Sequence, residues 1–511
     1  MTALYSLWHE CSSSATIRYM ELSSQLIKGE VKDDSETLEK YSRDASLFKI
    51  RPRVVVFPKD TEDIERLVSF IKGHEGLSLT VRAGGSGMTG GSLSESIIVD
   101  VNRHLNKLRE IGEKYASVQP GMWYRDFERE VAKRDLLLPS FPASKEICTV
   151  GGMVANNSGG ERSLVFGKTE KYIEELKVVL DDGHEYTFGP LNKKELSEKL
   201  ELQTREGEVY RGIYNIVEEN YDILWEAKPK VSKNSAGYYL WNVWNRTTFD
   251  LTQLFVGSQG TLGIITDIRF RLIRPKKHER LLIIFLRDIK PLAQIVREVL
   301  RFKPETFESY DKSTMMMALR YLPDFIKLLK ANIIALAWQF LPEIKMFVTG
   351  GMPSMILLAE FTGDSEEEAT LKAEQAQTAL KKFSIKTRVA SSDKEEHKYV
   401  TIRRESYNLL RNHISDKRTA PFIDDIVVRP DDLPEFLPRL YDILDDYKKY
   451  MIVTVAGHVG DGNFHIIPLM DLRKEESRRI IPELIEKVNR LVLEFKGSLT
   501  GEHNDCLLYT S

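Results

Sequence analysis

The chain has 511 residues, of which 42% are hydrophobic and 29% are charged, and its formal net charge is −3 at pH 7. This length predicts two or three domains with sizeable cores. The small net charge gives no electrostatic support to a nucleic-acid-binding protein, because such proteins carry a strongly basic surface. We therefore expect a multidomain globular protein that binds no nucleic acid.

Three cysteines, Cys11, Cys148 and Cys506, lie far apart and form no C-x-x-C pair. This spacing excludes a disulfide framework and an iron–sulfur cluster held by this chain alone, and it is typical of a reducing compartment. The N-terminus lacks the basic segment and the long apolar run of a signal peptide. We expect a cytoplasmic protein.

The longest apolar stretch, residues 331–344 (ANIIALAWQFLPEI), contains Asn, Gln, Pro and Glu. It is too short for a membrane span. Its simplest interpretation is a buried or interfacial helix. A peripheral contact with the inner face of the membrane is the alternative.

Residues 15–48 carry apolar residues at helical spacing and predict an N-terminal helical segment over residues 1–48. The next residues, RVVVFPKDTEDIERLVSFIKGHEGLSLTVRA, predict strand, helix and strand, with Asp60 or Thr61 as the N-cap and Gly73 at the helix end. The pattern of strand, turn and helix recurs at residues 116–139. The region therefore mixes strands and helices.

A basic, proline-containing segment at residues 271–280 (RLIRPKKHER) predicts a domain boundary. Beyond it, amphipathic helices such as residues 364–383 alternate with short apolar strands such as residues 355–361 and 451–458. This alternation predicts an α+β domain with an antiparallel sheet.

Five glycines within eight residues follow the strand LTVRA, in the order GGSGMTGG. Gly85, Gly87 and Gly90 reproduce the G-x-G-x-x-G spacing of a nicotinamide-binding loop. That loop must open a helix, whose N-terminus binds the pyrophosphate. Here the β-branched residues 97–99 follow and predict a strand. A nicotinamide site is therefore disfavoured, and the absence of G-K-[ST] excludes a P-loop.

The same glycines suit an anion-binding loop of another kind, because glycine permits a left-handed backbone and close approach, and successive amides form a concave nest. A merely tight loop is the alternative. The cradle for a diphosphate is favoured because two more glycine-rich segments follow. These are residues 141–168 (FPASKEICTVGGMVANNSGGERSLVFGK) and 254–266 (LFVGSQGTLGIIT).

Together the three segments resemble the FAD-binding domain of the vanillyl-alcohol-oxidase (PCMH-type) superfamily, in the branch of D-lactate, glycolate-oxidase-subunit and D-2-hydroxyglutarate dehydrogenases. The resemblance implies an α+β fold: an FAD-binding domain of two α/β subdomains over residues 49–275, and a cap domain over 276–511. It implies FAD contacts from Arg82, Gly84, Gly85, Ser86, Gly87, Met88, Thr89, Gly90, Pro142, Ala143, Ser144, Thr149, Gly151, Gly152, Asn156, Asn157, Gly257, Gly260, Gly263 and Ile264.

Two departures from the family pattern concern the cofactor. Relatives that tether their flavin carry a histidine in the first loop, whereas Gly85-Ser86-Gly87 offers none. We therefore expect non-covalent FAD. The third segment usually reads G-S-E-G-T-L-G, and Gln259 replaces its glutamate here, which keeps a hydrogen-bonding group and loses a charge.

The segment VTVAGHVGDGNFHIIPL places Asp461-Gly462 between apolar strand residues, which predicts a two-residue hairpin. That register pairs His458 directly with His465, with Cβ atoms about 5 Å apart. A lone histidine is usually structural, but an opposed pair suits chelation of one divalent metal.

Glu502 and His503 follow in GSLTGEHND. Two imidazoles and a carboxylate are a ligand set for zinc, manganese or iron. The resemblance implies that His458, His465 and Glu502 ligate the metal, that Asn463 contacts substrate, and that His503 is the catalytic base. The implied reaction is the oxidation of a D-2-hydroxy acid to the 2-oxo acid, with hydride transfer to FAD.

The substrate carboxylate needs a cationic partner. Arg404 best fits the family's W-x-x-R-[EK] position, although the tryptophan is absent, and Lys417 or Arg418 is the second candidate. A solvated helix face is the alternative for each of these three residues. The segment KNSAGYYL, residues 233–240, resembles a further family segment and is expected to line the flavin or substrate pocket.

The motif GEHND is most common in relatives whose flavin-binding half is fused to a cysteine-rich, ferredoxin-like half. We therefore expect an electron acceptor outside this chain, an iron–sulfur domain or subunit. The family pattern continues beyond this segment, so we expect a shortened terminus and a chain that binds FAD but turns over poorly. A homodimer is left open, as is the identity of the acid. The alternatives are a non-redox protein similar to ether-lipid synthases and a catalytically silent FAD-binding subunit.

Overall fold

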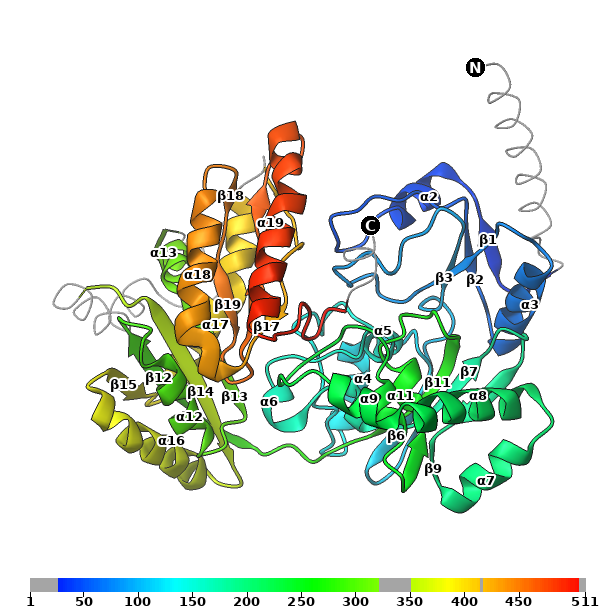
Figure 1. Cartoon of the computed structure of the whole chain (residues 1–511), viewed down its shortest axis with the longest axis horizontal. Helices are drawn as coiled ribbons and strands as arrows, with labels where there is room; N and C mark the ends of the chain where they lie inside the picture. The colour runs from blue at the N-terminus through cyan, green and yellow to red at the C-terminus, as the bar shows by residue number, and fades with distance from the viewer. Residues whose placement is uncertain (1–25, 321–350, 414–416, 505–511) are drawn as a thin grey trace.

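The computed structural model describes residues 26–320, 351–413 and 417–504 (Figure 1). The expectations for Cys11, Cys506 and the apolar stretch at 331–344 lie outside these residues. Cys148 is described and buried. Among the described helices, none combines the length and the apolar character that crossing a bilayer requires.

The predicted N-terminal helical segment is largely wrong where it is described. Strand β1 (Glu30–Lys32) comes first, and only α2 (Ser35–Tyr41) is helical, starting at the Asp34 N-cap. The pairing of β1 with β2 (Val54–Phe57) explains the difference, since it satisfies the backbone of residues 30–32 in a sheet rather than in a helix.

A first sheet has the strand order β1-β2-β4-β3. Helix α3 (Thr61–Lys72) begins at the Asp60 N-cap and ends at Gly73, as predicted. Strand β3 (Leu79–Arg82) leads into the first glycine loop, and β4 (Ile97–Asp100) follows it and pairs in parallel with both β2 and β3. The prediction that a strand and not a helix follows this loop is confirmed.

A second sheet of five antiparallel strands, in the order β5-β6-β11-β7-β8, packs against several helices (Figure 1). We call residues 26–271, which hold these two sheets, the N-terminal half. Its further elements are β5 (Leu108–Ile111), β6 (Tyr115–Val118), α4 (Tyr124–Ala132), α5 (Val150–Asn156), α6 (Ser163–Phe166), β7 (Ile173–Val179), β8 (Glu185–Phe188), β9 (Pro190–Asn192), α7 (Lys193–Glu201), α8 (Arg205–Glu219), α9 (Tyr221–Ala227), α10 (Leu240–Val243), β10 (Thr248–Asp250), α11 (Thr252–Phe255) and β11 (Ile264–Arg271).

The C-terminal half, residues 278–504, is built on a seven-stranded sheet in the order β15-β12-β14-β13-β19-β20-β17, antiparallel throughout. Its elements are β12 (His278–Leu286), α12 (Leu292–Leu300), β13 (Thr306–Asp311), α13 (Lys312–Arg320), β14 (Met355–Gly363), α16 (Glu366–Leu380), β15 (Lys386–Val389), α17 (Asp393–His413), β16 (Arg418–Thr419), β17 (Ile426–Val427), α18 (Leu433–Asp446), β18 (Met451–Ile452), β19 (Val455–His458), β20 (Asn463–Ile466), β21 (Leu469–Met470) and α19 (Glu475–Glu494).

Alternate residues along the strands of this sheet supply two cores. Leu282, Ile284 and Leu286 of β12 pack with α12, α16, α18 and α19, whereas Leu281 and Ile283 pack with α17. Both faces are therefore covered by helices, which explains the nearly continuous apolar sequence of β12 and β14. The predicted antiparallel α+β character is confirmed.

The predicted hairpin forms, but its register is wrong by two residues. His458 pairs with Asn463, and His465 pairs with Ala456, so that residues 459–462 make a four-residue turn. Because side chains alternate with a period of two, this shift leaves both histidines on one face. They become diagonal neighbours, with ring centroids 5.1 Å apart.

Gly462 ends this turn with a left-handed φ of +68°, and a Cβ atom there would lie 1.9 Å from the carbonyl oxygen of Val428. We expect Gly462→Ala to lower the free energy of unfolding by about 3 kcal/mol, because it adds both backbone strain and a backbone clash. Urea titration of the purified protein measures this change.

Gly212→Ala is the matched control, since Gly212 lies inside α8 and a Cβ there would meet no atom within 4 Å. This change should stabilise the protein by about 0.5–1 kcal/mol. Equal effects at the two glycines would contradict the role assigned to the turn.

Candidate active site

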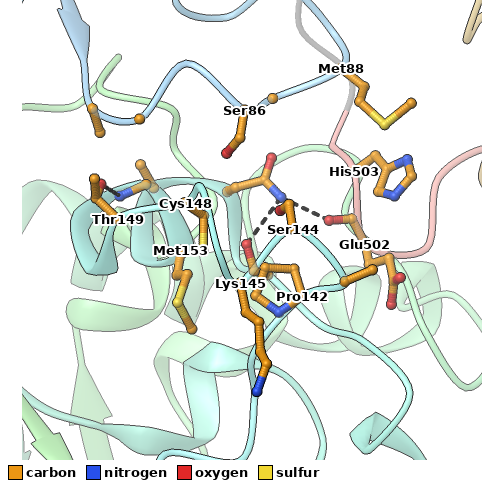
Figure 2. Close-up of a pocket in the computed structure, with 18 of the residues that line it drawn as sticks. Ser86, Met88, Pro142, Ser144, Lys145, Cys148, Thr149, Met153, Glu502 and His503 are labelled. Carbon is orange, nitrogen blue, oxygen red and sulfur yellow. Dashed lines mark hydrogen bonds between the residues drawn. The ribbon is translucent and has the colours of Figure 1, made fainter. Parts of the chain in front are cut away.

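A cavity of about 700 Å³ lies between the two halves. This volume is in the range of ligand-binding cavities. Figure 2 shows Ser86 and Met88 of the first glycine loop together with Ser144, Glu502 and His503 around it. Of the residues expected to contact FAD, those that line it are Gly84, Gly85, Ser86, Gly87, Met88, Thr89, Pro142, Ala143, Ser144, Thr149, Gly151, Gly152, Asn156, Gly260, Gly263 and Ile264.

Four expected FAD contacts, Arg82, Gly90, Asn157 and Gly257, do not line the cavity. The Arg82 guanidinium donates to the carbonyls of Tyr41 and Arg43, at 3.3 and 2.8 Å, and so supports the loop from behind. Asn157 ends α5 in a left-handed conformation, and its side-chain oxygen accepts from the Glu170 amide. For these two residues, the structure shows a supporting role in place of the expected contact.

The first glycine loop suits an anionic ligand. Among the described residues, no hydrogen bond runs from a backbone amide of residues 84–92 to a protein acceptor. At Gly87 a Cβ would meet no protein atom within 4 Å, and its φ is not in the left-handed region. Since neither packing nor backbone conformation requires a glycine there, its role is to leave room in the cavity. The loop therefore fits the pyrophosphate of FAD.

The second glycine segment differs from the first, because residues 150–156 form helix α5, capped by the Thr149 hydroxyl, which accepts from the Gly152 amide. A Cβ at Gly151 would lie 2.3 Å from Cβ of Pro120. Gly151 is therefore required by close packing of α5. Asn156, at the other end of α5, lines the cavity and donates to the backbone carbonyl of Glu502 over 2.8 Å.

Three expected metal ligands meet in the lining of the same cavity. One carboxylate oxygen of Glu502, Oε1, lies 3.2 Å from Nε2 of His458 and 3.5 Å from Nε2 of His465. One atom from each of the three residues lies within 4.8 Å of the others. Two imidazole nitrogens and one carboxylate oxygen that converge in this way fit a zinc, manganese or iron ion.

A buried carboxylate that the sequence did not reveal orients His458. Glu308, on β13, lies 2.6 Å from His458 Nδ1 and also pairs with Arg403. Burial lowers the pKa of His458, but the charges of Glu308 and Glu502 outweigh it and raise the pKa to about 9. A carboxylate on the far nitrogen of a metal-binding histidine fixes the ring orientation and the tautomer.

Lys233 balances the charge of Glu502. Its ammonium group lies 3.1 Å from Glu502 Oε2 and 3.1 Å from Asp461 Oδ2, and its side chain is 2% exposed. Burial opposes ionisation of Glu502, but Lys233 and His458 lower its pKa well below the usual range. Residues 233–240 do not line the cavity, contrary to expectation, and Lys233 instead contacts Oε2 of Glu502.

The Asp425 side chain organises the segment that carries Glu502 and His503. Its Oδ2 accepts from the Thr500 hydroxyl and from the amides of Gly501, Glu502 and His503, at 2.7–2.8 Å, and its Oδ1 accepts from the Asn463 amide at 2.9 Å. Asp425, His465 and His503 form a second cluster of metal-binding residue types. Because five donors already occupy the Asp425 carboxylate, we do not assign a metal to it.

His503, a member of this second cluster, lines the cavity. Its Nδ1 lies 2.9 Å from Asp424 Oδ2, and its ring stacks on that of His465 with centroids 5.1 Å apart and planes 16° apart. Burial lowers the pKa of His503, but the charges of Asp424 and Asp425 raise it to about 10. Nε2 is thus the ring nitrogen left to exchange a proton with a ligand.

The candidate substrate contacts divide into two groups. Arg404 lines the cavity, and so does Arg403, which the sequence reasoning missed although it is the neighbouring residue. Lys417, which precedes β16, and Arg418, which begins it, do not line the cavity. Asn463 is fully buried, and its amide bonds to Asp425, Ile426 and Lys233. The expectations for Lys417, Arg418 and Asn463 therefore do not agree with this geometry.

We expect Asp425→Asn to lower the free energy of unfolding by at least about 3 kcal/mol, because an amide nitrogen would face backbone N–H donors in a buried position. Burial raises the pKa of Asp425, but His503 and His465 together with backbone donors lower it overall. Its stabilisation is therefore present at neutral pH and is lost as the pH falls through the lowered pKa.

Urea titration at neutral pH measures this difference. Asp424→Asn is the matched control, because it removes the charge beside His503 but keeps a side-chain oxygen that can accept from His503 Nδ1, and it should cost about 1 kcal/mol. Equal losses for the two variants would show that Asp425 does not organise the segment.

Comparisons with known proteins agree with this arrangement. Residues 52–189 match the family described as "FAD binding domain", and residues 275–505 match "FAD linked oxidases, C-terminal domain". The fold is similar to that of alkyldihydroxyacetonephosphate synthase, with a TM-score of 0.64 at 16% identity over 92% of this chain and 78% of the other. It is also similar to 4-ethylphenol oxidase from Gulosibacter chungangensis, with a TM-score of 0.64 at 15% identity over 94% and 88% of the two chains.

The sequence is similar to those of several curated relatives. The chain is 25% identical to D-2-hydroxyglutarate dehydrogenase of Pseudomonas putida over 93% of this chain and 47% of that protein, so it spans about half of that relative's length. It is 26% identical to glycolate oxidase subunit GlcD of Bacillus subtilis over 91% of this chain and 83% of that protein. The chain therefore combines an FAD binding domain with the C-terminal domain of FAD linked oxidases, as the resemblance of the three glycine segments predicted.

Proposed function

We propose that the protein is an FAD-dependent dehydrogenase that oxidises a D-2-hydroxy acid to the 2-oxo acid. One observation carries the proposal: the cluster of His458, His465 and Glu502 opens into the same cavity as the first glycine loop. The names of the relatives support the substrate class, since they are dehydrogenases or an oxidase subunit for 2-hydroxyglutarate, lactate and glycolate.

FAD would be held without a covalent bond by the loop at residues 84–92 and by the residues around α5. No histidine occurs in that loop to tether it. FAD, when bound, supplies the acceptor for the hydride of the substrate Cα. The chain contributes the amides that bind the cofactor and the cavity that excludes water from the reacting atoms.

A divalent ion held by His458, His465 and Glu502 would supply Lewis acidity at the substrate hydroxyl. Lys233 occupies Glu502 Oε2, which leaves Oε1 to face the histidines. His503 would take the hydroxyl proton at Nε2. With its pKa near 10, the His503 imidazole is protonated at neutral pH. The positive charge of a metal ion at the neighbouring ligands would lower this pKa and so favour the neutral imidazole, which acts as the base.

Arg404 would pair with the substrate carboxylate at the same end of the cavity, and Arg403 would add positive charge there. These groups recognise the part that all 2-hydroxy acids share. Lys417 and Arg418 are not part of this proposal, because they lie outside the cavity lining.

We further propose that electrons leave the flavin for an acceptor outside this chain. The chain spans 47% of the D-2-hydroxyglutarate dehydrogenase of Pseudomonas putida, and the relative from Bacillus subtilis is named as a subunit. An iron–sulfur domain or subunit is the acceptor class that we expect. The three cysteines of the chain do not have the spacing that would hold such a cluster alone.

An anaerobic screen tests the reaction. We expect one or more of D-lactate, glycolate and D-2-hydroxyglutarate to bleach the visible absorbance of bound FAD, and a chelator to slow the bleaching. L-Lactate and L-2-hydroxyglutarate are the controls for stereochemistry. A protein with bound FAD that no acid bleaches would instead favour a silent FAD-binding subunit or the non-redox chemistry of ether-lipid synthases.

His465→Ala tests the proposed metal site. Removing one of three ligands should abolish stoichiometric metal in the purified protein and slow flavin reduction by at least about 100-fold. Elemental analysis and stopped-flow absorbance measure the two effects. His184→Ala is the control, because His184 lies in the turn between β7 and β8 of the N-terminal half. Unchanged metal content in His465→Ala would refute the assigned ligand set.

A further inference from the structure

One ion pair inside the cavity joins the two halves of the protein. The Arg404 guanidinium, on α17, donates to Oε1 of Glu161, which lies in the connection between α5 and α6. Both residues line the cavity. The cationic group proposed to bind the substrate carboxylate therefore already holds a carboxylate of the protein itself.

Glu161 lies among the charges that a substrate carboxylate would meet. Burial raises its pKa, but Arg404, and after it Arg403 and His458, lower the pKa to about 2. The chain near Glu161 also runs along the candidate metal ligands, since a Cβ at Gly159 would lie 3.1 Å from Glu502 Oε2. The carboxylate of Glu161 is thus held ionised at the end of the cavity where the acid would be oxidised.

The neighbouring arginine has a different kind of partner. Arg403 pairs with Glu308, which is not among the residues that line the cavity. The Glu161 side chain is 19% exposed and that of Arg404 is 52% exposed, so solvent reaches their contact. An ion pair of this kind is weak enough to exchange with a ligand.

We propose that Glu161 occupies Arg404 in the acid-free protein and is displaced when the substrate carboxylate binds. The inference rests on the proposed function, because it takes Arg404 as the carboxylate partner. Glu161 then sets the affinity for the acid: a ligand must bring its own carboxylate to release this ion pair. Entry of the acid also breaks a contact between the two halves.

Glu161→Gln in the FAD-loaded protein tests this displacement, because it keeps the shape of the side chain and removes its charge. Pyruvate is the probe, since a 2-oxo acid binds to the oxidised protein without turnover. Titration calorimetry and the shift of the flavin spectrum should show binding that is about five-fold tighter than in the unchanged protein, the factor that a half-exposed ion pair supports.

Two controls separate the charge effect from general changes. Glu146→Gln removes another carboxylate from the cavity lining and should change pyruvate affinity by less than about two-fold. Acetone, which has no carboxylate, should bind equally to Glu161→Gln and to the unchanged protein. Glu161→Ser, checked by its thermal midpoint, serves as a second variant and should also bind pyruvate more tightly.

The proposed displacement would be overturned if the Glu161 variants bound pyruvate no more tightly than the unchanged protein, or if none of the proteins bound pyruvate. Glu161 would then be assigned to orienting Arg404. Failure of the proposed function has a different signature, because it is the absence of flavin bleaching by every 2-hydroxy acid. Arg404→Gln distinguishes the carboxylate partner itself, since the displacement requires this variant to bind pyruvate less well.

Discussion

The buried carboxylate of Asp425 is the group on which the geometry of the site depends. Three successive amides and a hydroxyl converge on one of its oxygens, which fixes the chain direction from Thr500 to His503. That direction places the Glu502 side chain against the histidines of the β19–β20 hairpin and stacks the His503 ring on that of His465. A segment without regular secondary structure is in this way fixed by four hydrogen bonds to one carboxylate oxygen.

Around this turn, opposite charges are paired with few exceptions. Glu502 faces Lys233 and His458, Glu308 faces His458 and Arg403, and Asp424 faces His503. Buried ionic groups of this density are costly to desolvate, and they contribute orientation more than net stability. Their arrangement explains why the imidazoles of the site and the carboxylate of Glu502 face the cavity in fixed directions, which is the condition for metal binding and proton transfer at defined atoms.

The local patterns of the sequence predicted the elements well and their long-range contacts poorly. The β-branched residues after the first glycine loop correctly indicated a strand, and the glycine segments together indicated the family. The hairpin register was wrong because Asp461-Gly462 fits both a two-residue and a four-residue turn, and only the partner strands of the sheet decide between them.

The contacts that sequence reasoning missed join residues far apart in the chain. Glu308 meets His458 across 150 positions, and Lys233 meets Glu502 across 269. Neither residue belongs to a motif whose spacing would indicate the pairing. Asn463 was wrongly expected to contact substrate because its neighbours in sequence are site residues. Its side-chain amide instead forms hydrogen bonds with Asp425, Ile426 and Lys233.

The pairing of Lys233 with Glu502 limits how the two halves can be exchanged with those of related proteins. The lysine comes from the N-terminal half and the carboxylate from the C-terminal half, and Asn156 adds a second bond across the same boundary. Neither half is therefore an interchangeable module. A chimera that took one half from a relative would bury an unbalanced charge unless that half also carried the partner group.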